Sequence, residues 1–170
     1  MENAKNRNLT VWLVRISLIA VFLLGVMICA WWYPFSVSLT AVGLTPGEAP
    51  EISPAQYAEF WTQVGFYWLA SLPCFVTVGI GWRISTLIKN GREPSREAAG
   101  LMKTCFVIML SDCLTFIAAQ ATFCALGWND LWFIHFFAAG VGLLVTLALK
   151  LAADQMLNAA MLKEENEAYI

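Results

Sequence analysis

Three polar side chains in one long apolar stretch are the residues of this chain best placed to do chemistry. Asp112 lies about ten residues, or about 15 Å of helix, beyond the start of that stretch near residue 101. Thr115 and Gln120 follow at spacings of three and eight, near the same helix face. An ionisable group at membrane depth costs about 2.5–3.5 kcal/mol. The set therefore predicts a proton, cation or ligand site, or else a hydrogen-bonded contact that fixes helix packing.

His135 is the single histidine of the chain and lies near one end of another apolar stretch. An imidazole titrates between pH 5 and 8, which makes His135 a candidate pH-sensitive group. The alternative is a structural hydrogen bond to a neighbouring helix. Depths in the membrane place His135 about 10 Å or more from Asp112, too far for a direct catalytic pair. We therefore predict that the protein is not an enzyme.

The cysteines show no pattern of a metal site or a redox motif. All five lie within apolar stretches, without CxxC or Cys/His spacing, and behave by default as small apolar side chains. The formal net charge of −2 and the segregation of basic and acidic residues do not predict a surface that binds nucleic acid. We expect no metal, no cofactor and no direct binding of nucleic acid. The cysteines are Cys29, Cys74, Cys105, Cys113 and Cys124.

The elements that must position these residues are transmembrane helices. Charged residues make up 13% of the chain and hydrophobic residues 59%, whereas a soluble domain is roughly 25% charged. A helix needs about 20 apolar residues to cross a bilayer. Four stretches qualify, at residues 11–33, 64–88, 101–126 and 131–151. The sequence predicts an all-α polytopic membrane protein, with residues 1–170 forming one four-helix bundle.

The basic residues set the expected orientation, because loops rich in lysine and arginine stay in the cytoplasm. All ten lie before the first span, at its start, between the second and third spans, or at and after the end of the fourth. Residues 34–63 and the turn at 127–130 contain none. We predict that both termini and an inner loop at 89–100 are cytoplasmic and that residues 34–63 lie outside.

Two local signals refine the second span. Pro73 lies well inside it and predicts a kink, because its ring clashes with the preceding turn and removes a backbone donor. Ser53, Pro54 and Gln56 predict a helix start, as an N-cap, a first-turn proline and a partial capping box. That helix could lie on the outer interface or run directly into the second span.

The last helix is expected to continue into the cytoplasm as a tail over residues 152–170. Met156, Leu157 and Met161 recur there at helical spacing, and Glu164 and Glu165 are among the polar positions. Such a face could dock a protein partner in a groove. It could equally pack against the basic inner loop of the same chain.

Several segments resemble a bacterial family of four-span membrane proteins catalogued as domain of unknown function 2975. They are Leu72-Pro73-Cys74-Phe75, ISTLIKNGREPS, Leu101-Met102-Lys103 and the C-terminal LKEENEAYI, within a resemblance that covers residues 65–170. The chain departs from the family at its end, where Glu-Ala-Tyr-Ile replaces Asp-Leu-Thr-Ile, and at Glu93-Pro94, which replaces an apolar pair. The resemblance implies the bacterial plasma membrane and a cytoplasmic helix-turn-helix regulator as partner.

Three functions are compatible with these features. The first is a non-enzymatic sensor, immunity or regulator-sequestering protein, with the inner loop and the tail as its output surface. The second is a small transporter or channel component that uses Asp112, in which several copies of the chain could form a homo-oligomer. The third is an auxiliary subunit of a larger membrane complex. In each of them the lipid bilayer is the first partner.

Overall fold

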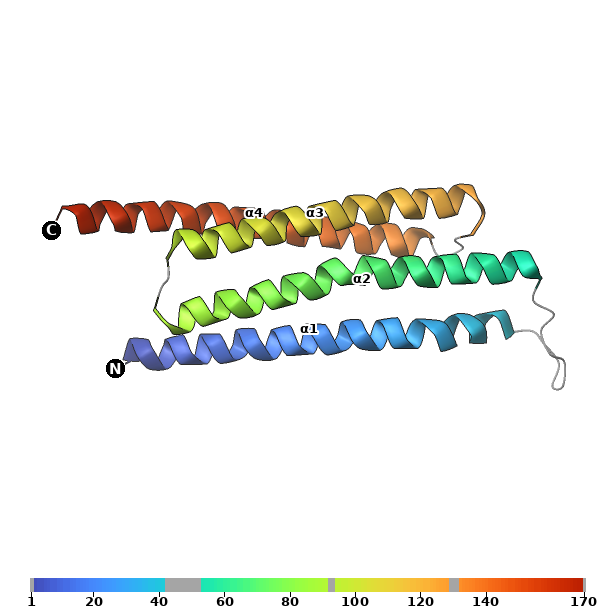
Figure 1. The fold of residues 1–170 in the computed structure, drawn as a ribbon, viewed down its shortest axis with the longest axis horizontal. Coiled ribbons are helices and arrows are strands. Elements are labelled where there is room, and N and C mark those ends of the chain that lie inside the picture. Colours follow the sequence, from blue (N-terminus) through green and yellow to red (C-terminus); the bar gives the residue numbers. More distant parts are fainter. Residues whose placement is uncertain (1, 42–52, 92–93, 129–131, 170) are drawn as a thin grey trace.

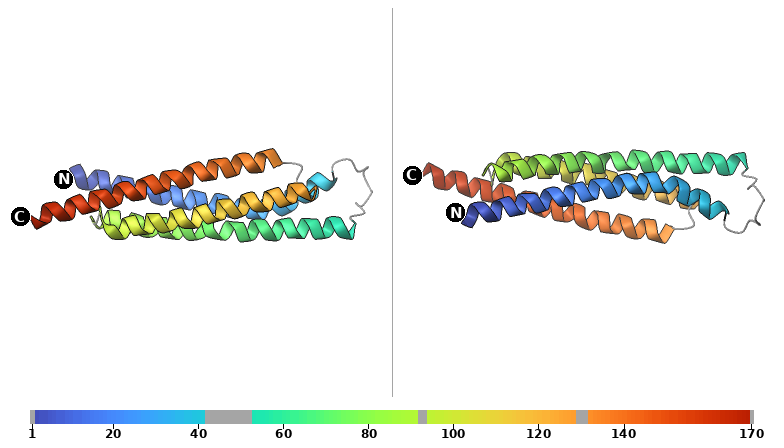
Figure 2. Two further views of the ribbon diagram at one scale, coloured as in Figure 1. Left: turned by 90° about the horizontal axis from the view of Figure 1, so that it is seen from above. Right: turned by 90° about the horizontal axis from the view of Figure 1, so that it is seen from below.

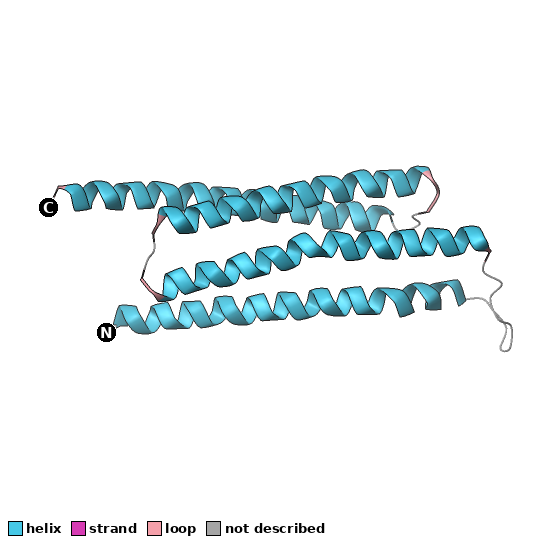
Figure 3. Ribbon diagram, viewed as in Figure 1, coloured by secondary structure: helices cyan, strands magenta, loops and turns pink. Residues whose placement is uncertain are grey.

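The computed structural model describes residues 2–41, 53–91, 94–128 and 132–169. These residues form α1 (Glu2–Ala41), α2 (Pro54–Lys89), α3 (Arg96–Ala125) and α4 (Trp132–Ala168). All regular structure among them is helical (Figure 3). Each helix contains a stretch long and apolar enough to cross a membrane. The predicted all-α architecture with four candidate membrane spans is confirmed.

The four helices run side by side along one long axis (Figure 1). The start of α1, the end of α2, the start of α3 and the end of α4 lie together at what we call the terminal end; the opposite end is the far end. Within the described residues, α1 packs on α2, α2 on α3, and α3 on α4. The α4 helix is inclined to α2 in both views of Figure 2. Which end faces the cytoplasm stays a prediction from the charges.

The helices extend beyond the apolar stretches on which the predicted spans were based. Residues 34–63, expected outside the membrane, contain the end of α1 and the start of α2, while residues 42–52 lie outside the described residues. Backbone hydrogen bonds within a helix need no apolar surroundings, so a helix can continue through the headgroup region. The α2 helix runs directly from its start into the second span, which resolves the alternative left open by the sequence.

The predicted start of α2 is confirmed by a complete capping box. The Ser53 hydroxyl accepts from the backbone N–H of Gln56 at 3.3 Å, and the Gln56 side chain accepts from the backbone N–H of Ser53 at 3.0 Å. Pro54 occupies the first helical position, where its missing N–H costs nothing. The exchange satisfies two backbone donors that the helix start would otherwise leave unpaired.

Pro73 lies near the middle of α2, and the helix continues through it. The ribbon of α2 changes direction about halfway along its length (Figure 1). Nearby, the Ser71 hydroxyl donates to the carbonyl of Trp68 at 2.7 Å and the Thr77 hydroxyl to that of Cys74 at 2.8 Å. Both acceptors are carbonyls other than that of Leu69, the one that Pro73 leaves without its helical N–H donor.

Small residues bring α3 and α4 close together. A side-chain carbon at Gly142 would lie 3.0 Å from the Cys113 sulfur, so the glycine is needed for this approach. The Thr146 side chain is wholly buried beside them and donates to the Gly142 carbonyl at 2.8 Å. Ala153 and Ala160 continue the buried face toward the C-terminus. Close backbone approach over small residues is the usual way in which helices associate in lipid.

Candidate functional site

A chain of hydrogen bonds joins α2, α3 and α4 toward the far end. The amide nitrogen of Gln120 on α3 donates to the hydroxyl oxygen of Tyr67 on α2 at 3.1 Å. The same oxygen lies 3.1 Å from Nε2 of His135 on α4. Gln120 is completely buried, and the other two side chains are half-buried. We call Tyr67, Gln120 and His135 the far-end cluster.

The bond between Tyr67 and His135 can run in either direction, and the tautomer of the imidazole decides which. An Nε2 without a proton accepts the Tyr67 O–H, whereas an Nε2 with a proton donates to the Tyr67 oxygen, which has a second lone pair beside the one that accepts from Gln120. A doubly protonated imidazole has donors at both nitrogens and can only donate in this contact. The protons on His135 therefore set the direction of its bond to Tyr67.

Aromatic rings enclose the far-end cluster. The Tyr67 and His135 rings stack with centroids 5.8 Å apart and planes inclined by 27°. The Phe116 ring lies 6.2 Å from that of Tyr67 and 6.3 Å from that of His135. Phe66 and Phe123 pack edge to face at 5.5 Å on the same side of α2 and α3. Apolar surroundings strengthen the enclosed hydrogen bonds and raise the cost of losing one.

A second contact at the far end links α2 to the end of α3. The Gln63 amide donates to the carbonyl of Trp128 at 2.6 Å and to the Glu59 carboxylate at 3.3 Å. Trp128 follows Gly127, whose φ of +72° ends α3 in a left-handed turn closed by a bond from Trp128 N–H to the Phe123 carbonyl at 2.8 Å. The turn is thereby held against α2 one helical turn beyond Tyr67.

Asp112 lies apart from the far-end cluster, on the α2–α3 contact. Its partner among the described residues is the Cys74 thiol, with 3.9 Å between the sulfur and Oδ2. The side chain is half-buried, and Cys74 directly follows Pro73. The carboxyl group thus lies beside the proline of α2 and next to a weak donor, and no basic residue in the described part of the chain pairs with it.

The polar face expected on α3 does not exist as one unit. Thr115 is exposed, and its hydroxyl donates to the Ser111 carbonyl of its own helix at 2.9 Å. Gln120 is eight residues, or about 12 Å along the helix, from Asp112, and it bonds Tyr67. Thr115 and Gln120 are five residues apart, which turns them about 140° from each other around the helix axis and places them on different faces. The structure links Gln120 through the Tyr67 hydroxyl to His135, while Asp112 and Thr115 have other hydrogen-bond partners.

At the terminal end the last turns of α4 project past the other helices (Figure 1). Glu164 accepts two hydrogen bonds from the Arg96 guanidinium on α3, at 2.6 and 3.0 Å. Met156 is half-buried, while Leu157, Met161 and Glu165 are exposed. The tail therefore contacts the start of α3 on one side and presents apolar side chains on another. This arrangement combines both alternatives that the sequence left open.

Tyr67 and Arg15 have roles that the sequence analysis missed. Tyr67 is the hub of the far-end cluster, and the available signal was a phenolic hydroxyl within an apolar stretch, which needs a partner when buried. Arg15, at the terminal end of α1, donates to the hydroxyls of Ser85 at 3.1 Å and Thr86 at 3.2 Å on α2. These pairings depend on which helix faces join, so no spacing within one helix reveals them.

Among the described residues, no group of three His, Cys, Asp or Glu side chains could hold a metal ion. Comparisons of the chain with protein-family models, with curated proteins and with solved structures find no match. The resemblance to the four-span bacterial family therefore stays a prediction. What the protein does has to be inferred from the side chains themselves.

Proposed function

We propose that the protein is a non-enzymatic sensor in the bacterial plasma membrane, with both termini cytoplasmic and the far end outside. The far-end cluster is the input and the tail of α4 is the output. In the sequence, the lysines and arginines lie before or at the start of the first span, from the end of the second span to the start of the third, and from the end of the fourth span onward, and this distribution supports the orientation. The family resemblance supports a cytoplasmic helix-turn-helix regulator as the partner that the tail binds.

The observation that carries the proposal is the continuity of α4. One unbroken helix of 37 residues extends from just before His135 to Ala168. Its length of about 55 Å exceeds the roughly 30 Å of hydrocarbon, so it links the far-end cluster to a region beyond the opposite interface. A rigid helix transmits a shift or rotation at one end to the other. Any change in the Tyr67–His135 contact would therefore act on the tail.

The output surface lies on the exposed side of the tail. Lys150 and Asp154 form an ion pair of 2.8 Å and are the first charged residues of α4, marking its emergence from the hydrocarbon. Beyond them Leu157, Met161 and Leu162 are exposed by 40%, 39% and 60%. Apolar residues at these spacings suit a helix that docks in a groove. Their place beyond the first charges makes a soluble protein a better partner than lipid.

Photo-cross-linking tests the output surface directly. A photoreactive amino acid is placed at Leu157 or Leu162 in the full chain in living bacteria, and cross-linked products are identified by mass spectrometry. We expect both positions to capture a helix-turn-helix protein. Leu144, which is exposed by 68% on α4 but lies within the membrane span, is the control and should capture none. Capture of no soluble protein from either tail position would refute the proposed partner.

The sensor mechanism has a separate test. Tyr67→Phe removes the hydroxyl that joins α3 and α4 and keeps the ring in place. We expect it to change the cross-linking yield at Leu157, while Thr115→Ala, which alters an exposed hydroxyl, should leave the yield unchanged. An unchanged yield in both variants would show that the far-end cluster is not coupled to the tail.

A second candidate function, ion or proton transport, rests on Asp112. A carboxyl group at membrane depth whose hydrogen-bond partner among the described residues is one thiol is poorly explained by packing alone. Reconstituted liposomes provide the test, with proton or cation flux compared between the wild type and Asp112→Asn. Transport predicts a flux that the variant abolishes. Absence of flux, or a flux indifferent to the substitution, would eliminate this candidate.

A further inference from the structure

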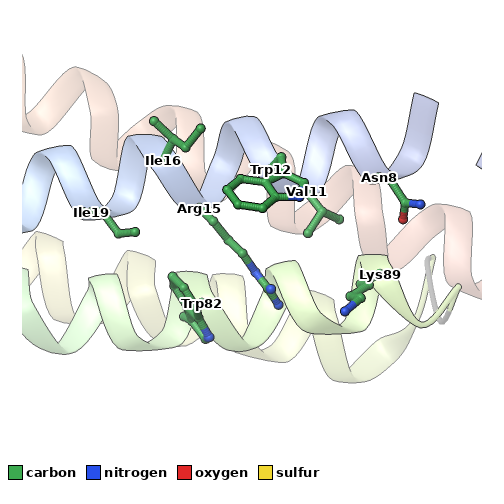
Figure 4. A pocket seen from close by; sticks show the side chains of 8 residues that line it. All are labelled: Asn8, Val11, Trp12, Arg15, Ile16, Ile19, Trp82 and Lys89. Carbon is green, nitrogen blue, oxygen red and sulfur yellow. The ribbon is translucent and has the colours of Figure 1, made fainter. Parts of the chain in front are cut away.

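A pocket of about 440 Å³ lies between α1 and α2 at the terminal end. Figure 4 shows Arg15 projecting from α1 toward α2, between Trp82 on one side and Lys89 on the other. The pocket is separate from the far-end cluster and from the tail, and neither proposed function uses it.

Arg15 is held in place within the pocket and keeps its charge unneutralised. Its guanidinium donates to the Ser85 and Thr86 hydroxyls and lies 4.7 Å from the centre of the Trp82 ring. Ser85 is completely buried, and its hydroxyl is itself anchored on the Trp82 carbonyl at 2.7 Å. Among the described residues no carboxylate pairs with Arg15. These contacts fix the orientation of the cation, while its remaining N–H donors can bind an anion.

The charges around the pocket all have the same sign. Lys89 lines it together with Arg15, and none of the acidic residues that the structure describes lines it. The Arg7 guanidinium lies just beyond, where it would come within 3.0 Å of a side-chain carbon at Gly91. Three cations thus gather along one helix contact, whereas Arg83 and Arg96, the other arginines among the described residues, are paired with glutamates. An anionic ligand complements this charge.

The lining changes from polar to apolar along the membrane normal. Asn8 and Lys89 lie in the part of the pocket nearest the terminal end. Arg15 follows two helical turns further along α1, and Ile16 and Ile19 form the deep part. Asn8 and Ile19 are about 16 Å apart along the helix. Ile16 and Ile19 are exposed by 53% and 48%, so the deep part opens toward the surroundings of α1. A ligand that fills the pocket must be anionic at one end and apolar at the other.

We propose that this pocket binds an anionic phospholipid. Its phosphate pairs with Arg15 and Lys89, and its acyl chains lie against Ile16 and Ile19. Basic pockets between helices at the membrane surface are a known means of recognising such headgroups. A zwitterionic lipid would bring its own ammonium group next to the clustered cations, without a carboxylate on the lining to receive it. The preference for a net negative headgroup follows from that difference.

The test is native mass spectrometry of the full chain, purified in mild detergent, stripped of lipid and titrated with phosphatidylglycerol or phosphatidylcholine. We expect phosphatidylglycerol adducts to be several times more abundant at equal concentration. Lys89→Gln should weaken phosphatidylglycerol binding about fivefold, the loss that one basic residue near a membrane surface accounts for. Lys89 takes no part in the contacts of Arg15, so this variant leaves the helix packing intact.

Two controls make the result decisive. Lys103→Gln removes an exposed lysine at the same end of the bundle, outside the pocket, and should leave phosphatidylglycerol binding unchanged. Glycerol 3-phosphate, a soluble anion with the same phosphate and no acyl chain, should not displace the lipid. Equal binding of both lipids, or an equal loss in the Lys103 and Lys89 variants, would overturn the proposal. Displacement by glycerol 3-phosphate would instead identify a site for soluble anions and would overturn it as well.

Discussion

At the far end, Gln120, Tyr67 and His135 bond one another in series between three helices, enclosed by phenylalanine rings and with Gln120 fully buried. At the terminal end, Arg15 is half-exposed and bonds two hydroxyls across a single helix contact. Uncharged groups can be taken wholly out of contact with solvent once each finds a partner, whereas a guanidinium must stay near the headgroups. We therefore expect the far-end cluster to control folding stability and the Arg15 group to control ligand binding.

The largest expected effect is that of Gln120→Ala. The substitution leaves the Tyr67 hydroxyl without its donor and opens a cavity at a fully buried position. We predict a loss of about 1–3 kcal/mol in the free energy of unfolding, measured by steric trapping or chemical denaturation in micelles. Thr115→Ala, on the exposed side of the same helix, should change it by about 0.5 kcal/mol or less. Similar losses in the two variants would show that the far-end cluster contributes no more to the free energy of unfolding than an exposed residue does.

Tyr67→Phe is expected to cost somewhat less, about 0.6–1.7 kcal/mol, because the ring stays packed and only hydrogen bonds between helices are lost. The same unfolding assay measures it. The double variant with Gln120→Ala should lose less than the sum of the two single losses, since both remove the same bond. Strict additivity would mean that the two side chains act independently and that the hydrogen-bonded series contributes nothing as a unit.

For Arg15→Gln we predict a loss of about 1 kcal/mol or less, despite the removal of a charge. The glutamine amide can still donate to Ser85, and an exposed cation–π contact contributes about 0.5–1 kcal/mol. Thermal or chemical unfolding in micelles checks this value. If the loss exceeded that of Gln120→Ala, the assignment of folding to one end and ligand binding to the other would be wrong.

The smallest change in stability is expected for Glu164→Gln. Arg96 and Glu164 are both more than half-exposed, and such pairs contribute about 0–1 kcal/mol. The tail should nevertheless become more mobile, as reported by a spin label at Leu157. Glu165→Gln is the matched control, because Glu165 is exposed beside it. Equal mobility in the wild type and both variants would show that the ion pair does not restrain the tail.

The number of helices could be predicted because crossing a bilayer demands about 20 apolar residues in sequence, a property of each stretch alone. The start of α2 could be predicted for a similar reason, since the capping box that marks it involves only Ser53 and its near neighbour Gln56. The far-end cluster was not predictable in this way. Its residues lie on three helices, and the faces that meet depend on how those helices pack. Spacing along α3 therefore grouped Gln120 with Asp112, while the packing placed it beside Tyr67.

Arg15 shows a similar limit. Its place near the start of an apolar stretch predicts a side chain that reaches toward the headgroups. The sequence does not indicate that Arg15 donates to the hydroxyls of Ser85 and Thr86 on α2, because serine and threonine are common residues and these two lie about seventy positions away. The pocket beside Arg15 exists only once α1 and α2 are packed together.

The way in which each helix packs on its predecessor has a consequence for how the protein is made. Among the described residues, close backbone contacts join α1 to α2, α2 to α3, and α3 to α4. During synthesis each newly inserted helix would thus find its main packing partner already in the membrane. The Tyr67–His135 contact is different, because it joins α2 to α4 and must wait for the last helix. Its closure would mark the moment at which the chain has finished assembling.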